Sequence, residues 1–242
     1  MNRRYLPLLL AAALSVPSLA AAQEPPRPPH QPRIHVAGEG EASVAPDMAI
    51  VSLSVMREAE TAREALDQNN TAIAEVIAAL KEAGIEARDL QTAGLQINPR
   101  YVFPQDNSGE PPRIQGYQVS NTLTVRIRDI SKVGEIIDKS VSLGVNQGGS
   151  ISFTNSDSSA TVTEARKRAV KDAVSRATTL AEAAGVKLGS IVEISEHSMM
   201  PQPMPISARA FKMEAAAADA VPVEAGENTY RVQVSVTFEI AQ

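Results

Sequence analysis

The sequence contains no cysteine and no tryptophan, and only 3% of its 242 residues are aromatic. Without cysteine the chain forms no disulfide, performs no thiol chemistry and carries no lipid on an N-terminal cysteine, so its stability must come from an ordinary hydrophobic core. The scarcity of aromatic rings argues against a carbohydrate-binding platform, which relies on ring stacking. The longest apolar run is about half of what a membrane-spanning helix needs.

The N-terminus has the pattern of a secretory signal peptide. A basic start at Met1–Arg4 precedes an apolar stretch, Leu6–Leu14, and a small-residue region, Ser18–Ala22. This predicts a signal peptide over residues 1–22, cleaved after Ala22 or Ala20, with no transmembrane segment left after cleavage.

Cleavage also changes the charge of the chain. Removing Arg3 and Arg4 from the 23 basic residues leaves 21 against 28 acidic ones, a net charge of −7. An acidic protein of this kind is a poor match for nucleic acid or an anionic membrane surface as partner.

The mature chain divides into a spacer and one domain. Residues 23–33 form the spacer, because five prolines between Glu24 and Pro32 favour an extended segment. Residues 34–242 then read as a single domain that is long enough to bury its own core.

The longest predicted helix, 161–184, carries a stripe of small apolar residues. Its charged residues lie on the opposite face, which therefore faces water. Because alanine side chains let a helix approach closely, we expect this helix to lie tightly against a sheet. Thr161 to Glu164 has the form of a capping box, and Gly185 ends the helix. The stripe consists of Val162, Ala165, Ala169, Ala173, Ala177, Leu180 and Ala184.

Two further helices are predicted, at 62–83 and 131–143. The first begins with a second capping box, Thr61 to Glu64, and ends at Gly84. Both long helices thus start at Thr-x-x-Glu and end in Ala-Gly, a likeness too weak to divide the domain into repeats.

Alternating or continuous apolar stretches predict about seven strands. The glycines Gly38 and Gly40 end the first strand and indicate a strand bulge rather than a phosphate loop, because no further motif glycine or Lys-Ser/Thr pair follows. We therefore predict an α+β fold: a largely antiparallel sheet of about seven strands, with two long helices and one short helix packed on one face. The strands lie near 34–40, 48–56, 90–102, 117–128, 151–154, 186–194 and 230–240.

Several short motifs occur in a fixed order along residues 34–242, and together they resemble those of one family. The motifs are Val36-Ala-Gly-Glu-Gly40 with Pro46-Asp47; Gly84-Ile85 with Asp89-Leu-Gln-Thr92; Gly116-Tyr117 with Val125-Arg-Ile-Arg-Asp129; Phe153-Thr-Asn-Ser-Asp157; Glu164-Ala-Arg166 with Ala169, Asp172-Ala173, Ala177 and Leu180-Ala181; Gly185 with Leu188-Gly189; and Pro222-Val-Glu-Ala-Gly226. They resemble the SIMPL-domain family, which includes the periplasmic immunogenic proteins of Gram-negative bacteria. The resemblance implies one α+β domain in the periplasm, with family members linked to stress tolerance and host antibody responses. It supplies no catalytic set and no cofactor, so no functional residue is carried over.

No pattern in the sequence indicates an enzyme. The three histidines, His30, His35 and His197, fall in the spacer, on a strand and at a strand end, and no nucleophile motif accompanies them. The paired carboxylates Glu39/Glu41 and Glu58/Glu60 are assigned to solvent. We expect a non-enzymatic assembly or interaction protein of the cell envelope, with envelope proteins or further copies of itself as partners.

An alternative function rests on the methionine-rich stretch 197–213. His197, Met199, Met200 and Met204 offer an imidazole and thioethers, which suit Cu(I). The same methionines fit an oxidant trap, since sulfoxide formation is repairable, and they also fit a loop that simply packs on the domain. We predict that this stretch binds no metal.

The polar faces of the predicted strands are almost free of lysine and glutamate. A sheet face in permanent contact with water normally carries charges that also prevent association. An uncharged hydroxyl and amide face is therefore predicted to be buried between copies, as a dimer or a larger ring. The face comprises Ser52, Ser54, Gln118, Ser120, Thr122, Thr124, Gln233, Ser235 and Thr237.

Overall fold

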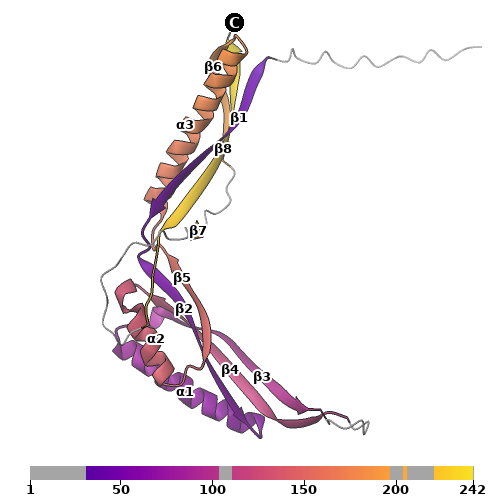
Figure 1. The fold of residues 1–242 in the computed structure, drawn as a ribbon, viewed down its shortest axis with the longest axis vertical. Coiled ribbons are helices and arrows are strands. Elements are labelled where there is room, and N and C mark those ends of the chain that lie inside the picture. Colours follow the sequence, from indigo (N-terminus) through magenta and orange to yellow (C-terminus); the bar gives the residue numbers. More distant parts are fainter. Residues whose placement is uncertain (1–30, 104–110, 197–203, 206–220, 242) are drawn as a thin grey trace, which may run out of the picture. The chain divides into compact units, whose positions relative to one another are not determined.

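The computed structural model describes residues 31–103, 111–196, 204–205 and 221–241, and its strands form two antiparallel sheets, each with helices on one face (Figure 1). The α+β class and the antiparallel pairing are confirmed. In the described part of the chain, no helix is long and apolar enough to cross a membrane. The predicted signal peptide and nearly all of the spacer lie outside the described residues and stay predictions.

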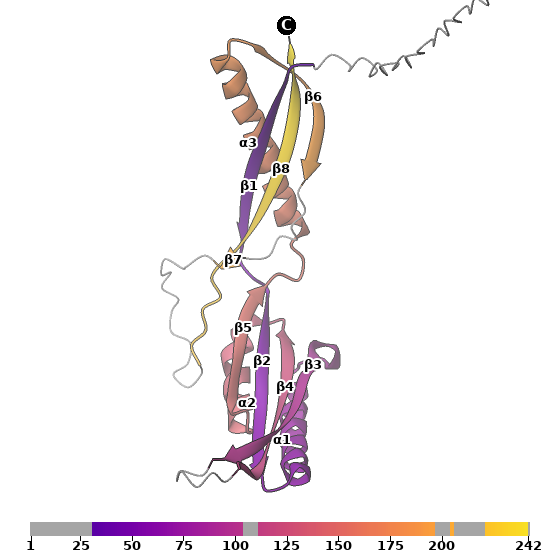
Figure 2. The same cartoon turned by 90° about the vertical axis from the view of Figure 1, so that its right-hand side faces the viewer.

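One sheet has the order β1-β8-β6, with the two-residue strand β7 also paired to β8. A single helix, α3, covers one face of this sheet and runs along β1 and β8 (Figures 1 and 2). Its elements are β1 (Arg33–Val44), α3 (Ser159–Ala183), β6 (Lys187–Glu196), β7 (Met204–Pro205) and β8 (Asn228–Ala241).

The second sheet has the order β3-β4-β2-β5. Helix α1 lies on β2 and β4, and α2 packs beside α1. The elements are β2 (Met48–Ala59), α1 (Ala62–Glu82), β3 (Leu90–Val102), β4 (Arg113–Ile127), α2 (Val133–Ser142) and β5 (Gln147–Thr154), with short 3₁₀ turns at η1 (Ala87–Asp89) and η2 (Ile130–Lys132).

The expected single sheet is thus divided in two. Alternation along a strand fixes which side chains share a face, but it does not identify the neighbouring strand. Strand β1 pairs with β8, from Arg33 opposite Glu239 to Val44 opposite Asn228, across nearly the whole length of the domain. No local pattern encodes a pairing at that separation, so the strands were wrongly assigned to one sheet.

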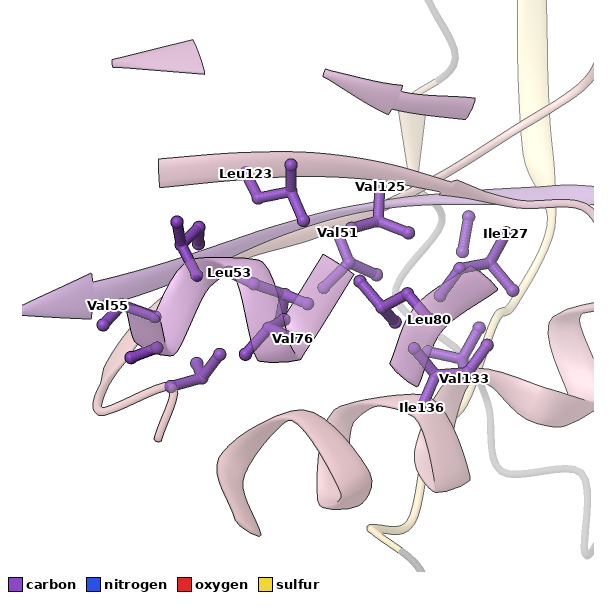
Figure 3. Packing of buried hydrophobic residues seen from close by; sticks show 14 residues of the cluster. Val51, Leu53, Val55, Val76, Leu80, Leu123, Val125, Ile127, Val133 and Ile136 are labelled. Carbon is purple, nitrogen blue, oxygen red and sulfur yellow. The ribbon is translucent and has the colours of Figure 1, made fainter. Parts of the chain in front are cut away.

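The core of the second sheet is built from branched aliphatic side chains. Val51, Leu53 and Val55 of β2 and Leu123, Val125 and Ile127 of β4 point toward Val76 and Leu80 of α1 and Val133 and Ile136 of α2 (Figure 3). The predicted alternation of β4 is confirmed for Val119, Leu123, Val125 and Ile127, all of which are buried.

Both ends of α1 agree with the sequence prediction. Thr61 is the N-cap, and its hydroxyl accepts a hydrogen bond of 3.2 Å from the backbone N–H of Glu64. At the other end Gly84 adopts a φ of 92°, the left-handed conformation that glycine tolerates best.

The first sheet is held to α3 by close backbone contact. Ala165, Ala169, Ala173 and Ala177 are fully buried, as the alanine stripe predicts. The two glycines of β1 lie directly beneath them: a Cβ on Gly38 would stand 2.2 Å from the carbonyl oxygen of Ala169, and one on Gly40 would stand 2.1 Å from that of Ala165. The tight packing of this helix on a sheet is confirmed.

The same contact corrects the interpretation of Gly38 and Gly40. The register between β1 and β8 runs without a shift through both residues, so the strand neither bulges nor ends there and continues to Val44. The glycines instead remove the side chains that would separate the strand from the helix backbone.

Two details of α3 differ from the prediction. The helix begins at Ser159, where the carboxylate of Asp157 accepts from the Ser159 N–H at 2.8 Å, so Thr161 is not its cap. At the C-terminal end Ala181 is buried, whereas Leu180 is 51% exposed. The buried residues of α3 follow steps of four, from Ala165 to Ala181, so Leu180 lies beside this row and not in it.

Candidate functional site

Of the histidines and methionines considered above, the structure describes only His35 and Met204. His35 lies exposed on β1, with its Nδ1 at 3.1 Å from the hydroxyl of Thr237. His30, His197, Met199 and Met200 lie outside the described residues, and of Met204 only its place in β7 is described. Within the described ranges, no three His, Cys, Asp or Glu residues are placed to hold a metal ion.

The paired carboxylates do not form an acid–base pair. Glu41 accepts a hydrogen bond of 2.7 Å from Arg231 across the β1–β8 pair, and Glu58 forms an ion pair with Arg100. The backbone N–H of Glu39 donates to Asp172 of α3 at 2.9 Å. Glu41 and Glu58 thus make ion pairs at the surface rather than standing free in solvent.

The only buried carboxylate in the described ranges is Asp89, which directly precedes β3. Both of its oxygens accept from Arg128, each at 2.8 Å. The hydrogen bonds from Arg128 lower the pKa of the Asp89 carboxyl, although burial acts in the opposite direction. Asp89 is therefore held charged and paired, which suits a structural clamp between the end of β4 and the start of β3 rather than a proton-transfer group.

A second polar cluster forms around Asn155, just after β5. The amide of Asn155 donates to the carbonyl of Ala45 at 2.7 Å, and its side-chain oxygen accepts from Asn228 at 2.9 Å and from the hydroxyl of Tyr230 at 3.0 Å. Beside it, Asp47 accepts from the N–H and the hydroxyl of Ser156, both at 2.7 Å. Every hydrogen bond in this cluster joins segments far apart in the sequence, so the cluster holds these segments together. The side chains that form it are engaged in these hydrogen bonds and are not free for chemistry.

Sequence reasoning missed the roles of Asp89 and Asn155, although both lie in the motifs that carry the family resemblance. Asp89 belongs to one motif and Arg128 to the next, so their pairing gives a structural reason for two of the matches. The available signal was an acid, Asp89, and a base, Arg128, in separate motifs. Because the pairing of β3 with β4 was not known from the sequence, it did not indicate that the two side chains are in contact.

A group of exposed apolar side chains lies on β3 and the hairpin that it forms with β4. Leu95 and Ile97 are 50% and 45% exposed, and they stand opposite Asn121 and Val119, on the face that α1 covers further along. Helix α1 lies mainly on β2 and β4 and contacts β3 less, so these side chains of β3 are left exposed. Toward the hairpin end, Tyr101 opposes Ile114, both about half exposed, and Phe103 is 69% exposed.

The uncharged strand faces lie where they were predicted, but on two different sheets. Thr122 and Thr124 of β4 face away from α1, since their neighbours Leu123 and Val125 are buried. The Thr122 hydroxyl donates to Ser54, which in turn donates to the carbonyl of Asn121. Ser235 and Thr237 belong to the outer face of the β1-β8-β6 sheet.

An apolar groove of about 280 Å³ lies between α2 and β5, at the edge of the second sheet. Its walls are Val51 and Leu53 of β2, Ile137 and Val141 of α2, Val145, and Ile151 of β5, with Gly148 and Gly149 at its rim. Val141 and Ile151 are 56% and 41% exposed, so the groove opens to solvent.

Two helix-covered antiparallel sheets, linked by the polar cluster around Asn155, define an α+β domain. The family model described as "SIMPL: Protein of unknown function (DUF541)" matches residues 34–238, and the chain belongs to this family. The predicted family is confirmed.

Particular relatives match nearly the whole chain. The "26 kDa periplasmic immunogenic protein" of Brucella melitensis biotype 1 is 53% identical over 236 residues, which cover 96% of this chain and 94% of that protein, and its counterpart in Brucella abortus matches equally. The "Uncharacterized protein YggE" of Escherichia coli K12 is 30% identical over 237 residues, covering 98% of this chain and 90% of that protein. With relatives of this name at this coverage, the protein is periplasmic, as predicted.

Proposed function

We propose that this protein is a non-enzymatic assembly or interaction protein of the cell envelope, that it associates with copies of itself, and that it contributes to stress tolerance. The observation that carries the proposal is the apolar surface of β3 and its hairpin, where Leu95, Ile97, Tyr101, Phe103 and Ile114 lie exposed. Contiguous exposed apolar side chains mark contact surfaces. A two-stranded ribbon is also marginally stable until it is packed against something.

A second copy of the chain is the partner that best fits this surface. Hydroxyls line part of both outer faces, from Ser54, Thr122 and Thr124 on one sheet and from Ser235 and Thr237 on the other, beside charges that are paired within the chain, such as Glu41 with Arg231. At the hydroxyl positions a second copy would meet hydrogen-bonding groups rather than charges. Homo-oligomers are also the commonest assemblies of exported and soluble chains alike. The pairing of Asp89 with Arg128 supports the non-enzymatic part, because the one buried acid that the structure describes is already neutralised.

Light scattering on the mature protein at micromolar concentration tests self-association. We expect an oligomer for the wild type and a lower mass for Phe103→Asp and for Thr122→Lys, which place charge on the hairpin and on the uncharged face. Leu180→Asp is the control, because it charges another exposed apolar residue, on α3, and should leave the mass unchanged. A monomeric wild type, or an oligomer unchanged in both variants, would contradict the proposal.

The link to stress is tested separately in cells. A strain lacking the protein should survive peroxide less well than its parent, and the Phe103→Asp variant should restore survival only in part if assembly is required. Equal survival of the deletion strain and its parent would remove this part of the proposal.

The alternative, copper binding or oxidant trapping through residues 197–213, has a direct test as well. Incubation with Cu(I) under a competing chelator should leave no stoichiometric copper on the protein. Submicromolar binding that disappears in a Met199→Leu/Met204→Leu variant would favour the alternative.

A further inference from the structure

The edges of the two sheets differ in how they are protected against pairing with another strand. Natural edge strands carry charges, proline or register shifts that discourage pairing. Of the longer edge strands that the structure describes, three follow this rule, with Arg33, His35, Glu39 and Glu41 on β1, Pro99 and Arg100 on β3, and Lys187, Glu193 and Glu196 on β6. Two register shifts also interrupt each of β3 and β6.

Strand β5 is the exception. Its sequence, Gln147-Gly-Gly-Ser-Ile-Ser-Phe-Thr154, contains no charge and no proline. Among the described strands it pairs only with β2, so its other edge is open. One register shift occurs at its glycines, and the stretch from Ile151 to Thr154 then pairs regularly with Val51 to Met48. Within this stretch the carbonyl of Phe153 already accepts a hydrogen bond of 3.3 Å from the amide of Asn228, so an added strand would pair with the backbone of Ile151 and the residues before it.

The open edge of β5 borders the apolar groove beneath α2. Ile151 stands opposite the buried Val51, so its side chain lies on the helix-covered face of the sheet. A strand added beside β5 would place alternate side chains on that same face, next to Val141 and Ile151. The groove is lined mainly by aliphatic side chains, with Ser52, Asn146 and Gln147 as uncharged polar members, and its volume of about 280 Å³ admits a branched aliphatic side chain.

We propose that β5 and α2 form a binding site for an extended peptide, which adds to the sheet as a strand and inserts an aliphatic side chain into the groove. Main-chain hydrogen bonds to β5 would supply affinity, and the groove would select the side chain. Because neither β5 nor the groove wall carries charge, the peptide's groove-facing residues should be uncharged. The inference rests on the proposed function as an interaction protein and names a second kind of partner for it.

A peptide fits this site better than a second copy does. The site requires aliphatic residues on the groove side of the added strand. Of the edge strands of this chain that have exposed aliphatic residues, β3 and β6 carry the charges, the proline and the register shifts that hinder pairing, and β5 has only one such residue, Ile151.

Fluorescence anisotropy with a labelled synthetic peptide, acetyl-Gly-Thr-Leu-Ser-Val-Thr-Gly-amide, tests the proposal on the mature protein. We expect saturable micromolar binding that weakens at least tenfold when lysine replaces the leucine and valine of the peptide. N-methylation of alternate backbone amides should weaken binding to the same degree, because it removes the donors that pair with β5.

Protein variants locate the site. Val141→Lys and Ile151→Lys should each weaken binding at least tenfold, whereas the control Leu180→Lys, a comparably exposed residue on α3, should not change it. Circular dichroism verifies that each variant is folded. If Ile151→Lys proves unstable, Val141→Lys still tests the site, because it changes only an exposed position on α2. Absence of binding at millimolar peptide, equal binding of the N-methylated peptide, or binding unaffected in both variants would overturn the proposal.

The same variants separate this proposal from self-association. If Ile151→Lys lowers the oligomer mass while the wild type binds no peptide, the open edge belongs to a second copy and the peptide site is refuted. If the wild type is a monomer that binds the peptide, the peptide site stands and the self-association proposal fails.

Discussion

The contact between α3 and β1 predicts a large and position-specific penalty for adding one methyl group. In Gly40→Ala the new Cβ would lie 2.1 Å from the carbonyl oxygen of Ala165 and 2.3 Å from the backbone nitrogen of Ala169. Ordinary contacts between such atoms are about 3.5 Å or longer. Both neighbours are helix backbone, which has no rotamer to change, so α3 must move away from the sheet by about 1 Å.

Overpacking a well-packed core costs about 1–3 kcal/mol, and occasionally more. Gly40→Ala belongs at the upper end, because the displacement also loosens the contacts of the buried stripe Ala165, Ala169 and Ala173. We therefore expect a loss of about 3 kcal/mol in the free energy of unfolding. For a domain of this size that corresponds to a fall of about 6–12 °C in the melting temperature.

The control is Gly94→Ala on β3, where an added Cβ meets no atom within 4 Å. Alanine there should be neutral or stabilise by up to about 1 kcal/mol, because it restricts the unfolded chain. Thermal and urea unfolding followed by far-UV circular dichroism measure both variants. Equal stabilities of the two variants, within about 0.5 kcal/mol, would refute the close-contact account.

Other elements give further predictions. Thr61→Ala should cost about 1 kcal/mol because it removes the N-cap of α1, whereas Thr161→Ala should cost almost nothing, since α3 begins before it; urea midpoints distinguish them. Asn69→Ala should cost about 2 kcal/mol by removing buried hydrogen bonds of 2.7 and 3.1 Å to strand carbonyls, while Asn70→Ala, the exposed neighbour, should be neutral. The pKa of Asp89 is lowered in the folded state, so its stabilisation is complete above about pH 4 and is lost as the pH falls through the folded-state pKa. Asp89→Asn should accordingly melt lower at neutral pH and show a weaker decline of melting temperature below pH 4; an unchanged acid profile would count against the pair.

Local features were predictable because they depend on residues close in sequence. Thr61 and Glu64 stand three apart, which suffices for a cap, and the alanine spacing on α3 required a close partner before that partner was known. Thr161 was misassigned because Asp157, only four residues upstream, competes as the helix start, and an acceptor side chain at either position could satisfy the N–H groups of a first helical turn. Asp89 and Arg128, 39 residues apart, needed a strand pairing that periodicity does not contain.

The exposed apolar surfaces of the protein could not be predicted from the sequence for the same reason, because they depend on which strands and helices are neighbours. An exposed Leu95 or Ile97 cannot be distinguished from a core residue by alternation alone, because both lie on the helix-covered face of the sheet. Their exposure depends on where α1 ends and which strands it covers, so the interaction surfaces proposed for β3 and β5 emerge only from the tertiary structure.

The division into two sheets also relates to the similarity between the two long helices, because each of them covers one sheet of similar topology. In one sheet the chain runs from β2 through α1 to the edge strand β3 and then to the central strand β4. In the other, α3 is followed by the edge strand β6 and then by the central strand β8, which pairs with β1. Each sheet thus has the order edge, centre, first strand, with all pairs antiparallel and the helix on one face. Since α1 and α3 each leave the strand that follows them uncovered, both units expose aliphatic residues there, Leu95 and Ile97 on β3 and Ile191 and Ile194 on β6. The same topology therefore produces an uncovered apolar strand twice, and contact surfaces are a consequence of how each unit is built.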